Sequence, residues 1–123
     1  MSKIATVEQG SILTDLSGRG FTMGTMFWVA ESLSDLRSEY ETANRNFGNA
    51  MEPGSPFCAG YMEDSHGYEV DGIRFPATPV GVADVETSLG SRSTDLVVRH
   101  IDPDPAPIRP GEPGFVLATG RAA

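Results

Sequence analysis

The segment SLSDLRSEYETANRNFG, residues 32–48, carries the pattern that decides the predicted fold. Its apolar side chains recur at spacings of three and four residues, so they line one side of a helix. These side chains are Leu33, Leu36, Tyr40, Ala43 and Phe47. Ser32 is a favourable N-cap, and Gly48 can adopt the left-handed conformation that ends a helix. We therefore predict one amphipathic helix, over about residues 33–47, that packs its apolar side against a sheet.

A β-hairpin is predicted downstream of this helix, over residues 67–75. Asp71-Gly72 is typical of two-residue type I′ turns, because both residues tolerate a positive φ. Such a turn fixes the register of the cross-strand pairs. The pairs are Tyr68 with Phe75, Glu69 with Arg74, and Val70 with Ile73. Each pair is chemically compatible, with an opposite-charge pair between two apolar pairs.

Further strands are predicted on both sides of these two elements. Apolar and β-branched residues over 21–30 favour a strand with both faces partly covered, in which Trp28 belongs to the core. Residues 80–85, with three valines, favour a second strand, and residues 95–101 favour a third. The predicted fold class is therefore α+β, with a mostly antiparallel sheet or partial barrel and the single helix packed on it.

An extended arm is predicted near the C-terminus. Residues 102–114 hold five of the nine prolines, so this stretch is neither a helix nor a central strand. We divide the chain into a compact core, residues 1–101, and an arm with a terminal strand, residues 102–123. The apolar residues 115–118 either add a strand to a neighbouring molecule or close the chain's own sheet. The predicted interface residues are Pro103, Pro105, Pro107, Ile108, Pro110, Phe115, Val116 and Leu117.

Charge and cysteine content narrow the classes of partner and compartment. The chain has 17 acidic and 9 basic side chains, and its net charge of −8 repels nucleic-acid phosphates. Its one cysteine cannot form an intramolecular disulfide, which is typical of proteins made in a reducing cytoplasm. Residues 1–6 do not read as a signal peptide, and the longest apolar run, residues 26–30, is too short to cross a bilayer. We therefore expect no nucleic-acid partner, no membrane partner and no secretion.

Two groups of polar residues contain side chains that can bind a metal ion. The first group is His100, Asp102 and Asp104, and the second is Glu63, Asp64, Ser65 and His66. The first group also fits the end of a strand that runs into a proline-rich turn, and the second fits a solvated loop before the hairpin. Because neither group is supported by a second cluster with ligand spacing, no metal site is predicted.

The sequence also contains single residues that occur in thiol enzymes and in phosphate-binding loops. Cys58 with His66 or His100 contains the parts of a thiol nucleophile and its base. Cys58 lies in a short apolar run, however, where a buried structural thiol is the commoner case. Gly18 and Gly20 lack the preceding strand and the lysine of a phosphate loop. No catalytic residue and no cofactor are therefore predicted.

These features favour a structural role over catalysis. We predict that the chain is not an enzyme but a virion structural protein, a capsid decoration protein of a tailed bacteriophage. Its expected partners are the major capsid protein and copies of itself in a homo-oligomer, and its expected location is the virion after synthesis in the host cytoplasm. One alternative is a small acidic inhibitor that imitates nucleic acid. A further alternative is a small thiol or metal enzyme.

Overall fold

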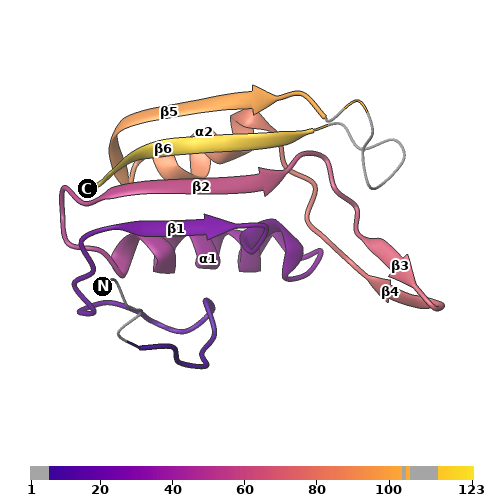
Figure 1. The fold of residues 1–123 in the computed structure, drawn as a ribbon, viewed down its shortest axis with the longest axis horizontal. Helices are drawn as coiled ribbons and strands as arrows, with labels where there is room; N and C mark the ends of the chain where they lie inside the picture. The colour runs from indigo at the N-terminus through magenta and orange to yellow at the C-terminus, as the bar shows by residue number, and fades with distance from the viewer. Residues whose placement is uncertain (1–5, 104, 106–113) are drawn as a thin grey trace.

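The structure is a computed structural model that describes residues 6–103, 105 and 114–123. Over these residues, two α-helices and two sheets make up an α+β fold (Figure 1). The strands are β1 (Gly24–Phe27), β2 (Pro56–Met62), β3 (Tyr68–Val70), β4 (Ile73–Phe75), β5 (Ser93–Ile101) and β6 (Phe115–Ala122). The helices are α1 (Arg37–Asn49), α2 (Val82–Gly90) and a short 3₁₀ helix, η1 (Ala30–Ser32). Among the described residues, no helix combines the length and the apolar character needed to cross a membrane.

The main sheet is mixed and open, with the strand order β1-β2-β6-β5. β1 pairs with β2 in parallel, whereas β6 pairs antiparallel with both β2 and β5. A parallel pair needs a crossover connection, and α1 supplies it between β1 and β2. The predicted α+β class is confirmed, but the sheet is mixed, does not close into a barrel, and is accompanied by a second α-helix.

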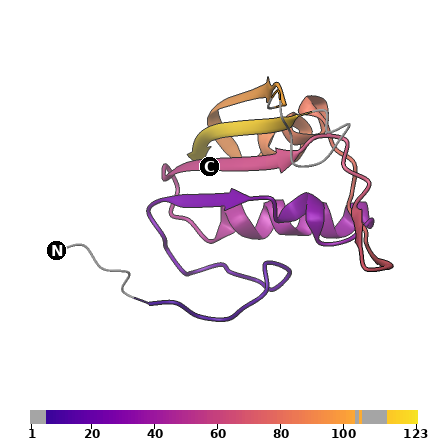
Figure 2. The same cartoon turned by 45° about the vertical axis from the view of Figure 1, so that its right-hand side comes forward.

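The core lies between one face of the main sheet and the two helices. The pairing register places buried residues side by side on this face, with Met26 beside Ala59 and Ala59 beside Ala118. Tyr40 of α1 and Val85 of α2 pack against them. Figures 1 and 2 show α1 along β1 and α2 behind β5 and β6. The fold therefore has two layers, one of helices and one of strands.

The opposite face of the main sheet is covered by no described helix. One row across it consists of Thr25, Cys58, Thr119 and Val97, which are neighbours in the strand register. Phe27, two residues after Thr25 on β1, is exposed on the same face, as is Val97. Sheets with parallel strands are usually covered on both faces, so this face departs from the common arrangement.

The start of α1 differs from the prediction. The helix begins at Arg37 rather than near residue 33, because Leu36 has an extended backbone with φ −87° and ψ 114°. The Ser34 hydroxyl accepts the Leu36 N–H at 3.1 Å, a local bond that competes with helix formation. Leu33 and Leu36 are consequently 36% and 56% exposed. The buried members of the predicted apolar stripe are Tyr40, Ala43 and Phe47.

The strand predicted over residues 80–85 is wrong, because most of this segment belongs to α2. Val85 and Leu89 are buried at helical spacing on the side that faces the core. The helix begins after Gly81, whose N–H donates to the Asp84 carboxylate at 2.8 Å. This bond satisfies a backbone donor at the helix start, and the run of valines alone does not reveal it.

The hairpin is confirmed in turn position and register. Asp71 and Gly72 have φ values of 51° and 79°, as a type I′ turn requires. The observed pairs are Tyr68 with Phe75, Glu69 with Arg74, and Val70 with Ile73. β3 and β4 form a separate two-stranded sheet, and Figure 1 shows it projecting beyond the end of β2.

The C-terminal residues 115–122 close the chain's own sheet, because β6 lies between β2 and β5. Val116 is fully buried, whereas Phe115 and Leu117 are half-buried. Pro103 and Pro105 are exposed. The other predicted interface residues, Pro107, Ile108 and Pro110, lie outside the described residues.

Candidate functional site

The candidate site is a small pocket, here called the aromatic pocket, at the carboxyl ends of β1 and β2. Trp28 directly follows β1, Met62 ends β2, and the hairpin β3–β4 supplies one wall. The pocket has a volume of about 240 Å³. Its lining consists of Trp28, Ser32, Met62, Ser65, Tyr68, Phe75, Pro76 and Ala77. Ligands of open α/β sheets usually bind outside the carboxyl ends of the parallel strands, which is where this pocket lies.

Trp28 takes its position from the end of β1. Its backbone has a φ of 59°, a value that is uncommon for a residue other than glycine. The Trp28 N–H donates to the Gly60 carbonyl at 3.1 Å, and its ring meets the Phe115 ring edge to face at 5.3 Å. The prediction that Trp28 is a core residue is wrong, because 43% of its surface is exposed. A strained, partly exposed aromatic residue at a strand end is typical of a ligand-binding position.

The hairpin contributes two more aromatic side chains. Tyr68 and Phe75 are cross-strand neighbours whose rings stack at 5.1 Å with an interplanar angle of 18°. Both rings remain partly exposed, at 40% and 42%. The Arg74 guanidinium donates to the His66 carbonyl and so links the strand to the loop that precedes the hairpin. The pair therefore presents a fixed aromatic wall to the pocket.

A buried carboxyl group, that of Glu31, lies directly behind the pocket wall. Glu31 is fully buried, and its Oε2 accepts the N–H of Met62, a lining residue, at 2.8 Å. Its backbone carbonyl accepts the Thr78 N–H at 2.8 Å. Among the described residues, Glu31 Oε1 has no hydrogen-bond partner. Burial raises the pKa of this carboxyl group, and the Met62 N–H partly opposes the shift.

The first group of candidate metal ligands, which the sequence analysis did not favour, is only partly assembled. Nδ1 of His100 lies 2.9 Å from Glu63, and Nε2 lies 2.9 Å from Asp102. The hydrogen bond to Asp102, aided by the Glu63 charge, raises the pKa of His100. Asp104 lies outside the described residues, and His66 of the second group is exposed. In the described part of the chain, no three such side chains form a metal site.

Cys58 and His100 are not brought together. Cys58 pairs with Thr119 on the face of the sheet that no described helix covers. His100 pairs with Val116, which in turn pairs with the buried Tyr61, so His100 belongs to the other face. The thiol and imidazole that the sequence offers as a catalytic pair are therefore separated by the sheet.

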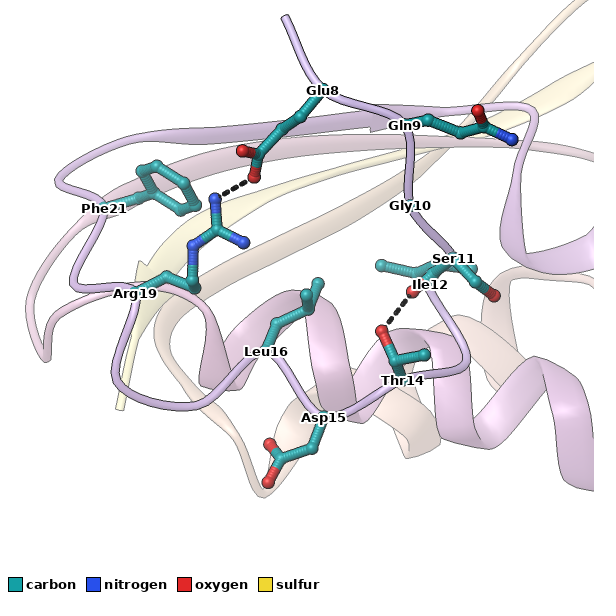
Figure 3. A pocket seen from close by; sticks show the side chains of 10 residues that line it. All are labelled: Glu8, Gln9, Gly10, Ser11, Ile12, Thr14, Asp15, Leu16, Arg19 and Phe21. Carbon is teal, nitrogen blue, oxygen red and sulfur yellow. Dashed lines mark hydrogen bonds and ion pairs between the residues drawn. The ribbon is translucent and has the colours of Figure 1, made fainter. Parts of the chain in front are cut away.

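A second hollow, of about 560 Å³, lies in the N-terminal segment (Figure 3). Residues 8–21 line it, and they precede β1 rather than following it. Glu8 and Arg19 form an exposed ion pair across it, and the Arg19 guanidinium lies 5.2 Å from the centre of the Phe21 ring. An exposed ion pair of this kind contributes little to the stability of the fold. Because this hollow is not at the carboxyl ends of the strands, we do not treat it as the candidate site.

Comparison with known proteins gives similarity in structure alone. No family model matches the chain, and no curated protein matches its sequence. The N-methyltransferase NodS from Bradyrhizobium japonicum, solved with S-adenosyl-L-homocysteine, is 17% identical at a TM-score of 0.62, over 92% of this chain and 52% of that chain. A possible histamine N-methyltransferase from Thermotoga maritima is 16% identical at 0.65, over 96% and 64%. A SAM-dependent methyltransferase from Methanosarcina mazei is 11% identical at 0.65, over 91% and 65%.

These similarities establish the fold and correct the functional prediction. The chain has the fold of part of a SAM-dependent methyltransferase and spans about half to two thirds of the length of these three enzymes. The prediction of a virion structural protein of a bacteriophage is wrong, because the similar structures are methyltransferases rather than capsid proteins. The same finding contradicts the prediction that the chain is not an enzyme. The predicted partners and virion location rest on that hypothesis alone and stay untested predictions.

The aromatic pocket does not have the size of a site for S-adenosylmethionine, the methyl donor of such enzymes. The aromatic pocket, at about 240 Å³, is smaller than the roughly 300–1,000 Å³ usual for ligands of that size. Gly18 and Gly20 precede β1, so they do not form a glycine-rich turn between a strand and a following helix. The pocket therefore suits a smaller molecule than the donor.

The sequence does not reveal the aromatic pocket, because its walls are distant in the chain. Only the pairing of Tyr68 with Phe75 was predicted, from the hairpin turn. Trp28 and Met62 join that pair because β1 and β2 end at the same edge of the sheet. One signal in the sequence was available. Trp28, Tyr68 and Phe75 are aromatic residues near the ends of predicted strands, and binding residues often lie at such positions.

Proposed function

We propose that this chain supplies the methyl-acceptor side of a SAM-dependent methyltransferase. The observation that carries the proposal is the aromatic pocket at the carboxyl ends of the parallel strands β1 and β2, in a fold similar to those enzymes. In this arrangement the pocket holds a small acceptor, and the donor approaches from outside the described residues.

Each wall of the pocket has a role in this proposal. Trp28, Tyr68 and Phe75 contact the apolar body of the acceptor and exclude water from it. The hydroxyls of Ser32 and Ser65 can orient a polar group of the acceptor through hydrogen bonds. Orientation alone contributes substantially to transfer reactions, because the reacting atoms must approach within about 3–3.5 Å in the correct geometry.

The donor site is assigned to polypeptide other than the described residues. Two features support this assignment. The chain matches only 52% to 65% of the length of the similar enzymes. In addition, β1 is an edge strand with no partner on its outer side among the described strands, and the sheet face that carries Phe27 is uncovered by a helix.

The proposal is tested by a methyl-transfer assay. The protein is tagged, isolated from its own cells together with every polypeptide that stays bound, and incubated with radiolabelled S-adenosylmethionine and a panel of small acceptors. We expect label in one or more acceptors, and we expect Phe75→Leu to raise the acceptor KM by about ten-fold, equivalent to about 1.4 kcal/mol of binding energy.

Phe21→Leu is the matched control, because Phe21 is also an exposed aromatic residue but lines the N-terminal hollow instead. This variant should leave the acceptor KM unchanged. Absence of label from every acceptor at saturating donor, with the protein folded, would refute the methyltransferase proposal.

A further inference from the structure

We propose that the ligand of the aromatic pocket is a small organic cation, an amine bound in its ammonium form. The inference deepens the proposed function, because it rests on the aromatic pocket being the acceptor site. It names the acceptor as an amine that binds as its ammonium ion and releases one proton to water before the nitrogen lone pair takes the methyl group, rather than a neutral aromatic or an acid.

The first support is the kind of surface that the pocket presents. Trp28, Tyr68 and Phe75 come from three different strand ends and line one small space. The Tyr68 and Phe75 rings stack on each other, so each keeps only its outer face for a ligand. The faces of aromatic rings carry negative electrostatic potential, so a ring face that borders the pocket attracts an ammonium group.

The second support is the charge around the pocket. No lysine, arginine or histidine is among its lining residues. Behind the wall, the Glu31 carboxyl group accepts the Met62 N–H through Oε2 and keeps an oxygen, Oε1, that has no hydrogen-bond partner among the described residues; it counts here as an acceptor rather than as a fixed charge. The whole chain carries a net charge of −8, which favours the approach of cations. An anionic ligand would meet no compensating charge in this space.

The third support is size. A volume of about 240 Å³ lies below the range usual for drug-sized ligands, so the pocket suits a head group with a few carbon atoms. Ser32 and Ser65 supply the only side-chain hydroxyls of the lining besides that of Tyr68, and these can form a hydrogen bond with an N–H or O–H group of the ligand.

Binding is measured through the fluorescence of Trp28, because Trp28 is the only tryptophan of the chain. The full chain is titrated with choline and, separately, with 3,3-dimethylbutan-1-ol, a neutral molecule of nearly the same shape, at constant ionic strength. We expect a saturable change with choline at a Kd about ten-fold lower than with the alcohol, as one to two cation–π contacts would produce.

Two variants and one control locate the binding. Tyr68→Leu and Phe75→Leu keep an apolar side chain but remove the ring, so each should raise the Kd for choline by about three- to ten-fold. Phe21→Leu, outside the pocket, should leave the Kd unchanged. If choline and the alcohol bind equally, or if neither binds, the inference is wrong.

The two proposals fail in distinguishable ways, because the fluorescence titration contains no methyl donor. Choline binding without methyl transfer to any acceptor would leave the cation site intact and refute the methyltransferase function. Methyl transfer to a neutral acceptor, with no preference for choline over the alcohol in the titration, would support the methyltransferase function and refute the cation site.

Discussion

At the scale of single residues, Glu31 is the most costly side chain beside the aromatic pocket. It is fully buried, one of its carboxylate oxygens accepts the Met62 N–H, and the other has no hydrogen-bond partner among the described residues. Burying a carboxylate is unfavourable unless it is paired. Such a group is usually retained for a functional reason, and cation binding in the adjoining pocket would provide one.

The raised pKa of Glu31 predicts a pH-dependent stability cost. The folded protein holds a proton on Glu31 at pH values where the unfolded chain, with a pKa near 4.5, has lost it. The contribution of Glu31 to the free energy of unfolding therefore falls as pH rises from about 4.5 through the higher pKa of the folded state. Glu31→Gln should accordingly become more stable relative to wild type at pH 8 than at pH 4, as measured by urea unfolding.

Glu86 provides the matched control for this measurement, because it is an exposed glutamate on α2. The difference between Glu86→Gln and wild type should not follow the same pH trend. An equal effect of Glu31→Gln at both pH values would mean that the Glu31 charge is not suppressed by burial.

Gly67 is the residue that allows the hairpin to approach the loop before it. Its φ is 99°, and a Cβ at this position would collide with the Phe75 carbonyl oxygen. We expect Gly67→Ala to displace the hairpin, at a cost of about 1–3 kcal/mol or more. Because Phe75 and Trp28 line the same pocket, the emission of Trp28 should shift to longer wavelength as its ring becomes more exposed.

Gly54→Ala separates backbone strain from this collision. Gly54 has a similar φ of 89°, but a Cβ there meets no atom within 4 Å. The Gly54 variant should lose some stability without a shift in Trp28 emission. The same shift in both variants would show that the collision at Gly67 is not what positions the hairpin.

At the scale of elements, α2 depends on the side chain of Asp84. Its carboxylate accepts the Gly81 N–H at the helix start and pairs with Arg37 of α1. Burial opposes ionisation of Asp84, but the Gly81 N–H and the Arg37 guanidinium outweigh it, and the pKa of Asp84 is lowered overall. Two neighbouring helices therefore share one carboxylate.

Asp84→Ala should destabilise the protein by about 1 kcal/mol in urea unfolding at neutral pH, mainly through the lost cap. The exposed ion pair contributes less, because solvent screens it. Glu86→Ala on the same helix should change stability by no more than about 0.5 kcal/mol. Equal effects of the two substitutions would show that the Asp84 cap does not stabilise α2.

At the scale of the whole molecule, the proposed function assigns the donor site to polypeptide other than the described residues. The similar enzymes have additional length, the described residues show no glycine-rich turn after a strand, and the aromatic pocket is smaller than a site for the donor. We expect calorimetric titration of the purified chain with S-adenosyl-L-homocysteine to give a Kd above about 1 mM. A Kd in the micromolar range would show that the chain holds a cofactor site of its own.

The sequence alone determined the features that depend on neighbouring residues. The hairpin register followed from Asp71-Gly72, because a two-residue turn allows few alternatives. The buried side of α1 followed from the spacing of Tyr40, Ala43 and Phe47. The prediction was wrong where local signals competed. The valines before residue 86 fit a strand as well as a helix. Only the Asp84 cap and the contacts of α2 with the core show that this segment is a helix.

The tertiary structure alone decided the order of the strands and the location of the site. The sequence left open whether residues 115–118 join a neighbour or their own sheet, and the structure places β6 between β2 and β5. The parallel pairing of β1 with β2 brings Trp28 to the edge where β2 ends and the hairpin begins. Such contacts join residues far apart in the chain, so their formation depends on which apolar faces can be buried together. No local pattern of residues records that choice.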